Sequence, residues 1–273
     1  MSKIYSICSM MHQHVKAKKH LGQHFLNDEN IALKIVESLV DVCKAPTVLE
    51  IGPGMGVLTK YLLPKDFTLY AIDVDAESVE YLKKHYPTLG NRVLLADFLQ
   101  MNIPATFASQ LAIIGNFPYN ISSQIVFKIL ENKELIPCMA GMFQKEVAER
   151  ICAGPGGKEY GILSVLTQAY YNLEYLFTVP EHVFTPPPKV KSGVMRMVRK
   201  DVAPDINEKM LYRVVKAAFN QRRKKLRNAI AQFGVSDDIL QPSGYADKRA
   251  EQLSVNDFIN LTNLVIAHGN TNN

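Results

Sequence analysis

The chain has 273 residues, of which 47% are apolar and 21% are charged. This balance excludes an intrinsically disordered chain, and the modest glycine and proline content excludes collagen-like and low-complexity chains. The net charge is only +5, and no apolar run approaches the roughly 18 residues that a membrane span needs.

Hydrophobic periodicity predicts alternating helices and strands over most of the chain. A helix is predicted over Asn27–Val42, which Asn27 or Asp28 can cap. Strands are predicted at Thr47–Ile51, Phe67–Ile72, Arg92–Leu95, Leu111–Ile114, Met139–Phe143, Tyr175–Val179 and Gly193–Val198. Helices are predicted near Val57–Leu63, Ala76–His85, Ser122–Asn132, Lys145–Cys152 and Tyr160–Tyr171. Apolar strands that alternate with helices are typical of an α/β fold with a parallel sheet covered on both faces.

The pattern changes at Lys200–Asp205. Beyond this point no strand signal follows, and one helical stripe is apolar: Leu211, Val214, Val215, Ala218 and Phe219. We therefore expect three parts: a basic N-terminal arm over residues 1–26, a sheet domain over 27–202 and a small all-helical C-terminal domain over 203–273.

Basic residues gather in two places. Four lysines and no acids lie between Met1 and Asn27, and five basic residues and no acids lie between Asn220 and Asn228: Arg222, Arg223, Lys224, Lys225 and Arg227. Clustered positive charge is typical of a polyanion-binding surface. For either cluster alone, a merely solvated surface is an equally good interpretation.

The four cysteines lie far apart in the sequence and form no CxxC pair: Cys8, Cys43, Cys138 and Cys152. This spacing argues against a zinc site or a redox motif, so no metal is expected. Met1–Met11 lacks the apolar core and cleavage site of a secretory signal. We expect reduced thiols, a cytoplasmic protein and no membrane association.

A glycine-rich turn, Glu50–Gly56 (EIGPGMG), follows the first strand and opens a helix. Glycines let the backbone turn sharply and let a ligand approach it, so Gly52 and Gly54 are candidate binding positions. The G-x-G-x-G spacing differs from the G-x-G-x-x-G of dinucleotide sites, and no Gly-Lys-Ser/Thr follows to make a P-loop. Alone, the turn is equally compatible with a tight strand–helix connection.

Acidic residues end the next two strands. Asp73 can accept hydrogen bonds from both hydroxyls of a ribose, and Asp97 can accept one from an adenine amino group. Either acid alone is more often a solvated loop carboxylate. Three ligand-type features at the ends of three successive strands nevertheless describe a pocket for an adenosine without phosphates, which fits S-adenosylmethionine.

The tetrapeptide Asn116-Phe117-Pro118-Tyr119 follows the fourth strand. The Asn116 side-chain oxygen and one main-chain carbonyl, either the one preceding Pro118 or that of Pro118 itself, can accept hydrogen bonds from both N–H groups of an exocyclic amine. Those bonds aim the nitrogen lone pair at a sulfonium methyl group, and Tyr119 can stack on a flipped base. The alternative is an ordinary turn at a proline.

These motifs resemble the ribosomal RNA adenine N6,N6-dimethyltransferases, from about Lys18 to about Leu253. The shared stretches are Leu21–Leu26 (LGQHFL), the glycine turn, Asp73, Asp97, Asn116–Tyr119, Gln144–Val147 (QKEV), Phe184–Val190 (FTPPPKV) and Phe219–Asn228 (FNQRRKKLRN). The resemblance implies a Rossmann-like class I methyltransferase sheet with a helical domain, S-adenosylmethionine as methyl donor, and a monomer.

The resemblance also implies roles for single residues. It places His24 and Leu26 at the methionine end of the cofactor, Gly52 at its backbone side, Asp73 at the ribose, Asp97 at the adenine and Asn116 at the transfer site. It implies that Phe184 stacks on the target base, and a core aromatic is the alternative at this position. Lys189 is either a phosphate contact or merely solvated. The Arg222–Arg227 run lies on a predicted helix, which can contact RNA phosphates on more than one side. The chain departs from the family pattern at His24, where Asn is common, at Asp73, where Glu is usual, and at Phe117, where Leu is common.

The resemblance implies dimethylation of two adjacent adenosines in the 3′-terminal hairpin loop of 16S rRNA, with a role in small-subunit biogenesis. A 23S rRNA methylase of the macrolide-resistance type shares this chemistry, but Phe219–Asn228 resembles the small-subunit branch. The intact Asn116–Tyr119 motif disfavours a non-catalytic assembly factor. The glycine spacing disfavours a nicotinamide dehydrogenase.

Overall fold

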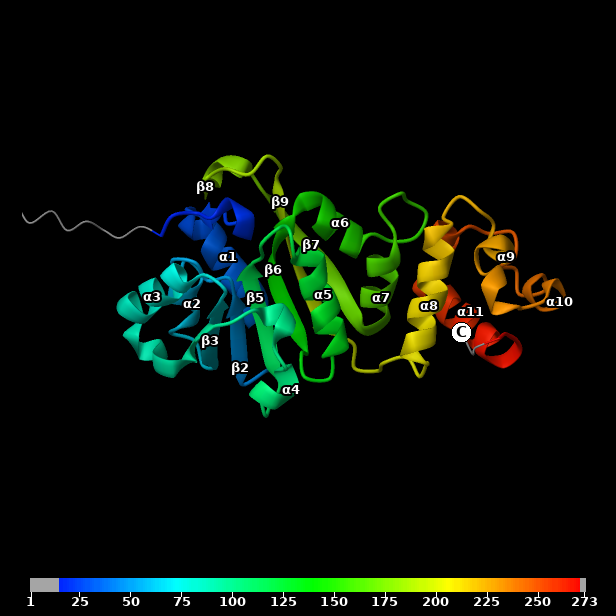
Figure 1. Cartoon of the computed structure of the whole chain (residues 1–273), viewed down its shortest axis with the longest axis horizontal. Coiled ribbons are helices and arrows are strands. Elements are labelled where there is room, and N and C mark those ends of the chain that lie inside the picture. Colours follow the sequence, from blue (N-terminus) through cyan, green and yellow to red (C-terminus); the bar gives the residue numbers. More distant parts are fainter. Residues whose placement is uncertain (1–14, 271–273) are drawn as a thin grey trace, which may run out of the picture.

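The computed structural model describes residues 15–270 and shows a seven-stranded sheet between helices, followed by a group of helices at one end (Figure 1). Residues 1–14 of the predicted arm, with Cys8, lie outside the described residues. The strands are β1 (Phe25–Leu26), β2 (Thr47–Ile51), β3 (Thr68–Asp73), β4 (Val93–Leu95), β5 (Leu111–Asn116), β6 (Cys138–Gln144), β7 (Tyr171–Val179), β8 (Phe184–Thr185) and β9 (Ser192–Arg199).

The helices of the sheet region are α1 (Glu29–Val40), α2 (Thr59–Leu62), α3 (Ala76–His85), α4 (Ile103–Thr106), α5 (Ser122–Glu131), α6 (Lys145–Cys152) and α7 (Ile162–Tyr170). Those that follow are α8 (Glu208–Asn220), α9 (Leu226–Ala229), α10 (Asp237–Leu240) and α11 (Val255–His268). Short 3-10 turns lie at Lys19–Leu21, Pro87–Arg92, Phe98–Gln100, Glu181–Val183, Ala231–Phe233 and Ala250–Gln252. Among the described residues, no helix has the length and apolar character needed to cross a bilayer.

The large sheet is mixed, with strand order β4-β3-β2-β5-β6-β9-β7. The five strands from β4 to β6 are parallel, but β9 runs antiparallel to both of its neighbours. The prediction of a parallel sheet is therefore wrong for β9, whereas β7 runs in the same direction as the five parallel strands. The segment between β7 and β9 contains no crossover helix, so the chain returns in the opposite direction.

Neighbouring residues of the central strands face different cores. On β2, Val48 packs with apolar residues of α1 and α3, whereas Leu49 packs with those of α5 and α7. A strand alternates its side chains between two faces, and both faces here are covered by helices. Burial on both faces accounts for the continuous apolar run that made β2 predictable.

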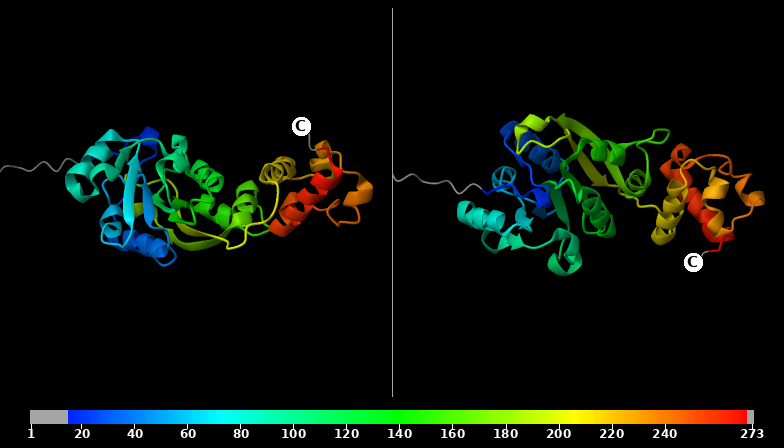
Figure 2. Two further views of the ribbon diagram at one scale, coloured as in Figure 1. Left: turned by 90° about the horizontal axis from the view of Figure 1, so that it is seen from below. Right: turned by 45° about the horizontal axis from the view of Figure 1, so that its top comes forward.

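The helices after residue 207 continue the core on the α5–α7 side of the sheet. Met210 and Val214 of α8 and Phe258 of α11 belong to the same apolar cluster as Leu166 of α7. Figure 2 shows the α8–α11 group standing beyond the end of the sheet, with α8 nearest to it. The helical group is therefore anchored on the sheet region through α7 and α8.

The predicted helix over the Arg222–Arg227 run is wrong. Helix α8 ends at Asn220, residues 221–224 form a turn, and only Arg227 of the five basic residues lies in a helix, the single turn α9. The apolar stripe of α8 ends at Phe219, and no apolar side chain follows before Leu226 to hold another helical turn against the core. Like charges four positions apart, as at Arg223 and Arg227, would lie side by side on a helix and further disfavour it here.

Candidate functional site

The carboxyl ends of β4, β3, β2 and β5 lie side by side, because these strands are neighbours in the sheet. The glycine turn after β2 places Gly52 and Gly54 at this edge with φ of +67° and +54°. Such left-handed backbone favours glycine. A Cβ at Gly54 would also lie 2.8 Å from the Phe25 ring, so this position has no room for a side chain.

Asp73 ends β3 and is 7% exposed. One carboxylate oxygen accepts a hydrogen bond from the Gly54 amide at 3.3 Å, and the other accepts one from the Asp75 amide at 2.9 Å. Burial raises the pKa of Asp73 from its ordinary value. A carboxylate offers about four lone-pair positions, so both oxygens can still accept bonds from a ribose.

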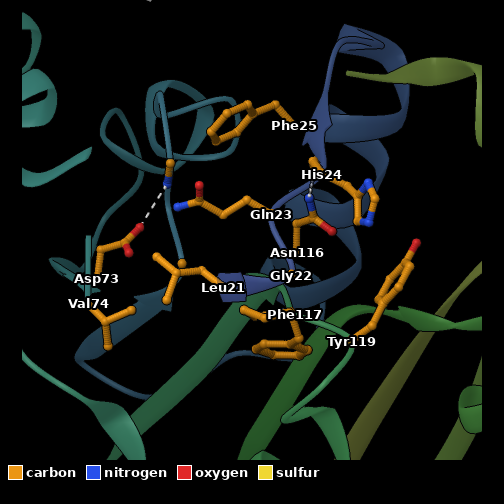
Figure 3. A pocket seen from close by; sticks show the side chains of 13 residues that line it. Leu21, Gly22, Gln23, His24, Phe25, Asp73, Val74, Asn116, Phe117 and Tyr119 are labelled. Carbon is orange, nitrogen blue, oxygen red and sulfur yellow. Dashed lines mark hydrogen bonds between the residues drawn. The ribbon is translucent and has the colours of Figure 1, made fainter. Parts of the chain in front are cut away.

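Asn116 ends β5, and a hydrogen bond fixes which way its side-chain amide faces. Its Nδ2 donates to the main-chain carbonyl of His24 at 2.8 Å. A carbonyl only accepts, so the amide must present its NH2 group to His24 and its oxygen elsewhere. Figure 3 shows Asn116, His24 and Tyr119 on one side of the pocket and Asp73 on the other.

The residues after Asn116 are held tightly. The Phe117 ring is 1% exposed and packs on Phe143, with ring centroids 4.9 Å apart. The Pro118 carbonyl accepts a hydrogen bond from the Ile121 amide at 3.2 Å, whereas no residue in 15–270 donates one to the Phe117 carbonyl. Of the two carbonyls that the sequence left open as acceptors, the one preceding Pro118 is therefore available.

Tyr119 is fixed from two sides. Its hydroxyl is 2.6 Å from the Ser192 hydroxyl of β9, and its ring stacks beside the His24 imidazole with centroids 5.4 Å apart. The His24 Nδ1 is 2.7 Å from the Pro186 carbonyl, so this nitrogen must carry the proton that forms the bond. Burial raises the pKa of Tyr119, so the phenol is neutral at physiological pH.

One pocket, partly open to solvent, brings most of the predicted residues together. The predicted residues that line it are His24, Gly52, Gly54, Asp73, Asn116, Pro118 and Tyr119. The pocket is also lined by residues to which the sequence assigned no individual role: Leu21, Gly22, Gln23, Phe25, Val74 and Phe117. Leu21–Phe25 lay within a family motif, but no periodicity in that segment indicates that it covers the sheet edge. No three His, Cys, Asp or Glu side chains of residues 15–270 converge to hold a metal.

Besides the basic run at 222–227, four predicted residues lie outside the lining of this pocket. Leu26 and Phe184 are paired in the small β1–β8 sheet and are 4% and 3% exposed, so they belong to the core in this structure. Asp97 accepts hydrogen bonds from the Leu99 amide and the Gln100 side chain at the end of β4. Lys189 lies exposed on the segment after β8.

Of the five basic residues at 222–227, three have partners within the described chain and two do not. The Arg222 guanidinium donates to the carbonyls of Gly157 and Lys158 at 2.8 and 2.6 Å and fixes that loop. Lys225 and Arg227 both pair with Asp247, and their hydrogen bonds lower the pKa of this carboxyl to about 2. Within the described chain, Arg223 and Lys224 have no side-chain partner.

Comparison with known proteins identifies the family. The family model for ribosomal RNA adenine dimethylase matches residues 14–267. The chain belongs to this family. It is 58% identical over 257 residues to the ribosomal RNA small subunit methyltransferase A of Flavobacterium johnsoniae, covering 93% of this chain and 98% of that one. The corresponding protein of Cytophaga hutchinsonii is 56% identical over 253 residues, which are 92% of this chain and 98% of that one.

Solved structures agree with the sequence comparison. A dimethyladenosine transferase from Plasmodium falciparum superposes with a TM-score of 0.78 at 26% identity, covering 90% of this chain and all of that one. The 23S rRNA methyltransferase ErmE has a TM-score of 0.70 at 24% identity, covering 89% of this chain and 99% of that one, and shows a shared fold. The Rossmann-like methyltransferase sheet with C-terminal helices is thereby confirmed.

Proposed function

We propose that this rRNA adenine dimethyltransferase transfers methyl groups from S-adenosylmethionine to N6 of two adjacent adenosines in the 3′-terminal hairpin loop of 16S rRNA. One observation carries the proposal: the Asn116 amide is held by the His24 carbonyl so that its oxygen is the free acceptor, in the pocket that also contains Asp73. The small-subunit names of the relatives at 58% and 56% identity support the choice of rRNA.

The pocket fits an adenosine-containing methyl donor. Asp73 is buried at the pocket wall with lone pairs left for ribose hydroxyls, and glycine backbone at 52 and 54 lets a ligand approach the turn closely. Residues 21–23 line the same pocket, which lies at the carboxyl ends of the strands. When bound, S-adenosylmethionine supplies a methyl group activated on a sulfonium. No metal enters the proposal.

The chain's own groups prepare the target amine. The exocyclic nitrogen of adenine is a poor nucleophile because its lone pair is delocalised into the ring. The Asn116 oxygen and the Phe117 carbonyl accept hydrogen bonds from the two N–H groups of this amine, which aims its lone pair toward the cofactor side of the pocket. Tyr119, held by Ser192, stacks on the flipped base. These interactions strengthen as positive charge develops on the nitrogen, so they act mainly in the transition state.

RNA binding is proposed for the exposed cations. Lys189 lies exposed on the segment that follows β8, and Arg223 and Lys224 lie on the turn after α8 with no side-chain partner among the described residues. We assign residues 27–202, together with the pocket-lining residues 21–25, to methyl transfer and 203–273 to binding rRNA in the small subunit or its precursor. We further propose that the enzyme acts in the cytoplasm as a monomer. Roles for Leu26 and Asp97 at the cofactor, and for Phe184 at the base, stay predictions.

The test is methylation of small ribosomal subunits from cells that lack the enzyme. The purified chain and S-adenosylmethionine should produce a primer-extension stop at two adjacent adenosines of the 3′-terminal hairpin, and Asn116→Ala should produce none. Modification of 23S rRNA instead would identify the resistance-type activity. Binding of the particle without any methyl transfer would identify an assembly factor.

A further inference from the structure

A short strap, residues 18–27, crosses the pocket and is bonded to different elements at its two ends. Its middle, Leu21–Phe25, forms part of the pocket lining. A Cβ at Gly22 would lie 2.8 Å from the Asn120 side chain, so the strap packs closely on the segment after Tyr119. In Figure 3 Gln23 extends across the space between Asp73 and Asn116.

At the cofactor side, the strap is fastened to Asp75. The Lys18 ammonium contacts the Asp75 carboxylate at 2.5 Å and Glu77 at 3.1 Å. The Gln23 amide donates to the second Asp75 oxygen at 3.0 Å, and its own oxygen accepts from the Lys18 main-chain amide at 2.7 Å. Lys18, Gln23 and Asp75 therefore form one closed set of contacts, which we call the latch.

Asp75 connects the latch to the proposed ribose site. It is 2% exposed, caps α3 through the Glu77 amide, and donates its own amide to the Asp73 carboxylate at 2.9 Å. Burial alone would raise the pKa of Asp75, but the hydrogen bonds from Gln23, Lys18 and the Glu77 amide, together with the Lys18 charge, outweigh burial and lower it. The carboxylate is thus ionised at physiological pH, and it needs a cation opposite it.

At the substrate side, the strap is bonded to the segment around β8. Asn27 donates its main-chain amide to the Val183 carbonyl at 2.8 Å and its side-chain amide to the Thr185 hydroxyl at 2.7 Å. His24 contacts the Pro186 carbonyl through its ring and holds Asn116 through its own carbonyl. The strap therefore contacts both the proposed cofactor site and the side chain that orients the target amine.

We propose that Lys18, Gln23 and Asp75 are positioning residues that fasten this strap over the methyl donor, so that cofactor exchange requires the latch to open. The inference rests on the proposed function, because four methyl transfers per RNA require four exchanges of cofactor for product. The exposed side of the latch is the Lys18 ammonium, with a 28% exposed side chain, whereas the Asp75 side chain is fully buried. Opening therefore begins by releasing Lys18 to water.

The chain offers a matched pair of variants for the test. Lys18→Met removes the latch cation, whereas Lys19→Met removes an exposed neighbouring charge that has no partner within the described residues. Lys18→Arg restores the charge. Two readouts need no RNA: hydrogen–deuterium exchange of the peptide covering residues 18–27, and the dissociation rate of S-adenosylhomocysteine, the product form of the cofactor, from the full chain.

Lys18→Met should exchange faster over the strap and release S-adenosylhomocysteine roughly three- to tenfold faster, while Lys19→Met and Lys18→Arg stay close to wild type. Because the ion pair is partly exposed, added salt should speed release from wild type and have less effect on Lys18→Met. Equal release rates for Lys18→Met and Lys19→Met would overturn the latch and leave the proposed function standing. Failure of the wild-type chain to bind S-adenosylhomocysteine would overturn both. The salt series on wild type alone keeps the latch testable if Lys18→Met is poorly folded.

Discussion

Replacing Asn116 with alanine should nearly abolish methyl transfer while leaving the fold intact. The substitution removes two interactions of different kinds. The 2.8 Å bond from Nδ2 to the His24 carbonyl is structural, and its loss should lower the free energy of unfolding by about 0.5–1.5 kcal/mol. The free side-chain oxygen is the proposed acceptor of the target N–H, and it acts on a nitrogen that becomes positive during transfer.

The size of the catalytic effect follows from that charge. A hydrogen bond to a charged group contributes about 1.5–3 kcal/mol, and removing one preorganised polar group from a comparable site lowers kcat by roughly 10²–10³. The interaction is strongest in the transition state, so kcat should fall far more than KM for RNA rises. Single-turnover methylation of small subunits at saturating enzyme measures this directly.

Asn102→Ala is the matched control for this variant. The Asn102 side chain caps α4 by accepting from the Ala105 amide at 3.2 Å and is not among the pocket residues. Its loss should lower stability by about 0.5–2 kcal/mol, similar to the structural loss at Asn116, without changing kcat. An Asn116→Ala enzyme that turns over within threefold of wild type would refute the proposed role of the amide oxygen. Equal losses of kcat in both variants would refute it as well.

Three further predictions concern other parts of the chain. Asp73→Asn should weaken S-adenosylmethionine binding by roughly 10- to 100-fold in calorimetry, because a charged acceptor is lost at the ribose, and unchanged affinity would remove Asp73 from the site. The double variant Arg223→Gln/Lys224→Gln should lower the log–log salt slope of small-subunit binding by roughly 1.4–1.8 with an unchanged melting temperature, whereas the exposed pair Lys83→Gln/Lys84→Gln should leave the slope as in wild type. Burial raises the pKa of Glu50 to about 7, helped by the nearby Asp73 charge and opposed by the Thr59 hydroxyl bond. Between about pH 4.5 and 7 the folded state therefore keeps a proton on Glu50 that the unfolded state has lost, so the free energy of unfolding falls as the pH rises through this range. Glu50→Gln cannot titrate and should remove up to about 3 kcal/mol of this pH-dependent fall. Urea melts at pH 5 and 7.5 measure the difference.

Most strands and helices were predictable because their side chains face one or two apolar cores. Strand β2 was predicted with its exact observed bounds, and so were α3 and α6. The direction of β9 was not predictable from periodicity, since parallel and antiparallel strands bury the same residues on the same two faces. What decides it is the length and content of the connection from β7, which carries no crossover helix.

The site was predictable only where it follows strand ends. Asp73 and Asn116 end β3 and β5, so the alternation of strands with helices already placed them at one edge of the sheet. The strap is held at the same pocket by contacts between residues 92 positions apart, as between His24 and Asn116, and up to 162 positions apart, as between His24 and Pro186. Such contacts leave no periodic trace, and only a family motif hinted at Leu21–Leu26.

A count of the charges in the basic run at 222–227 does not show which of its cations are available to bind RNA. The sequence contains five cations within six positions, and all five are equivalent as formal charges. In the structure Arg222 fixes the loop at Gly157, and Lys225 and Arg227 share Asp247, so much of their charge is already balanced within the chain. A phosphate gains most from a cation that has no partner to give up, because a paired cation must first break an existing interaction. Arg223 and Lys224 should therefore supply most of the salt-dependent affinity of this turn.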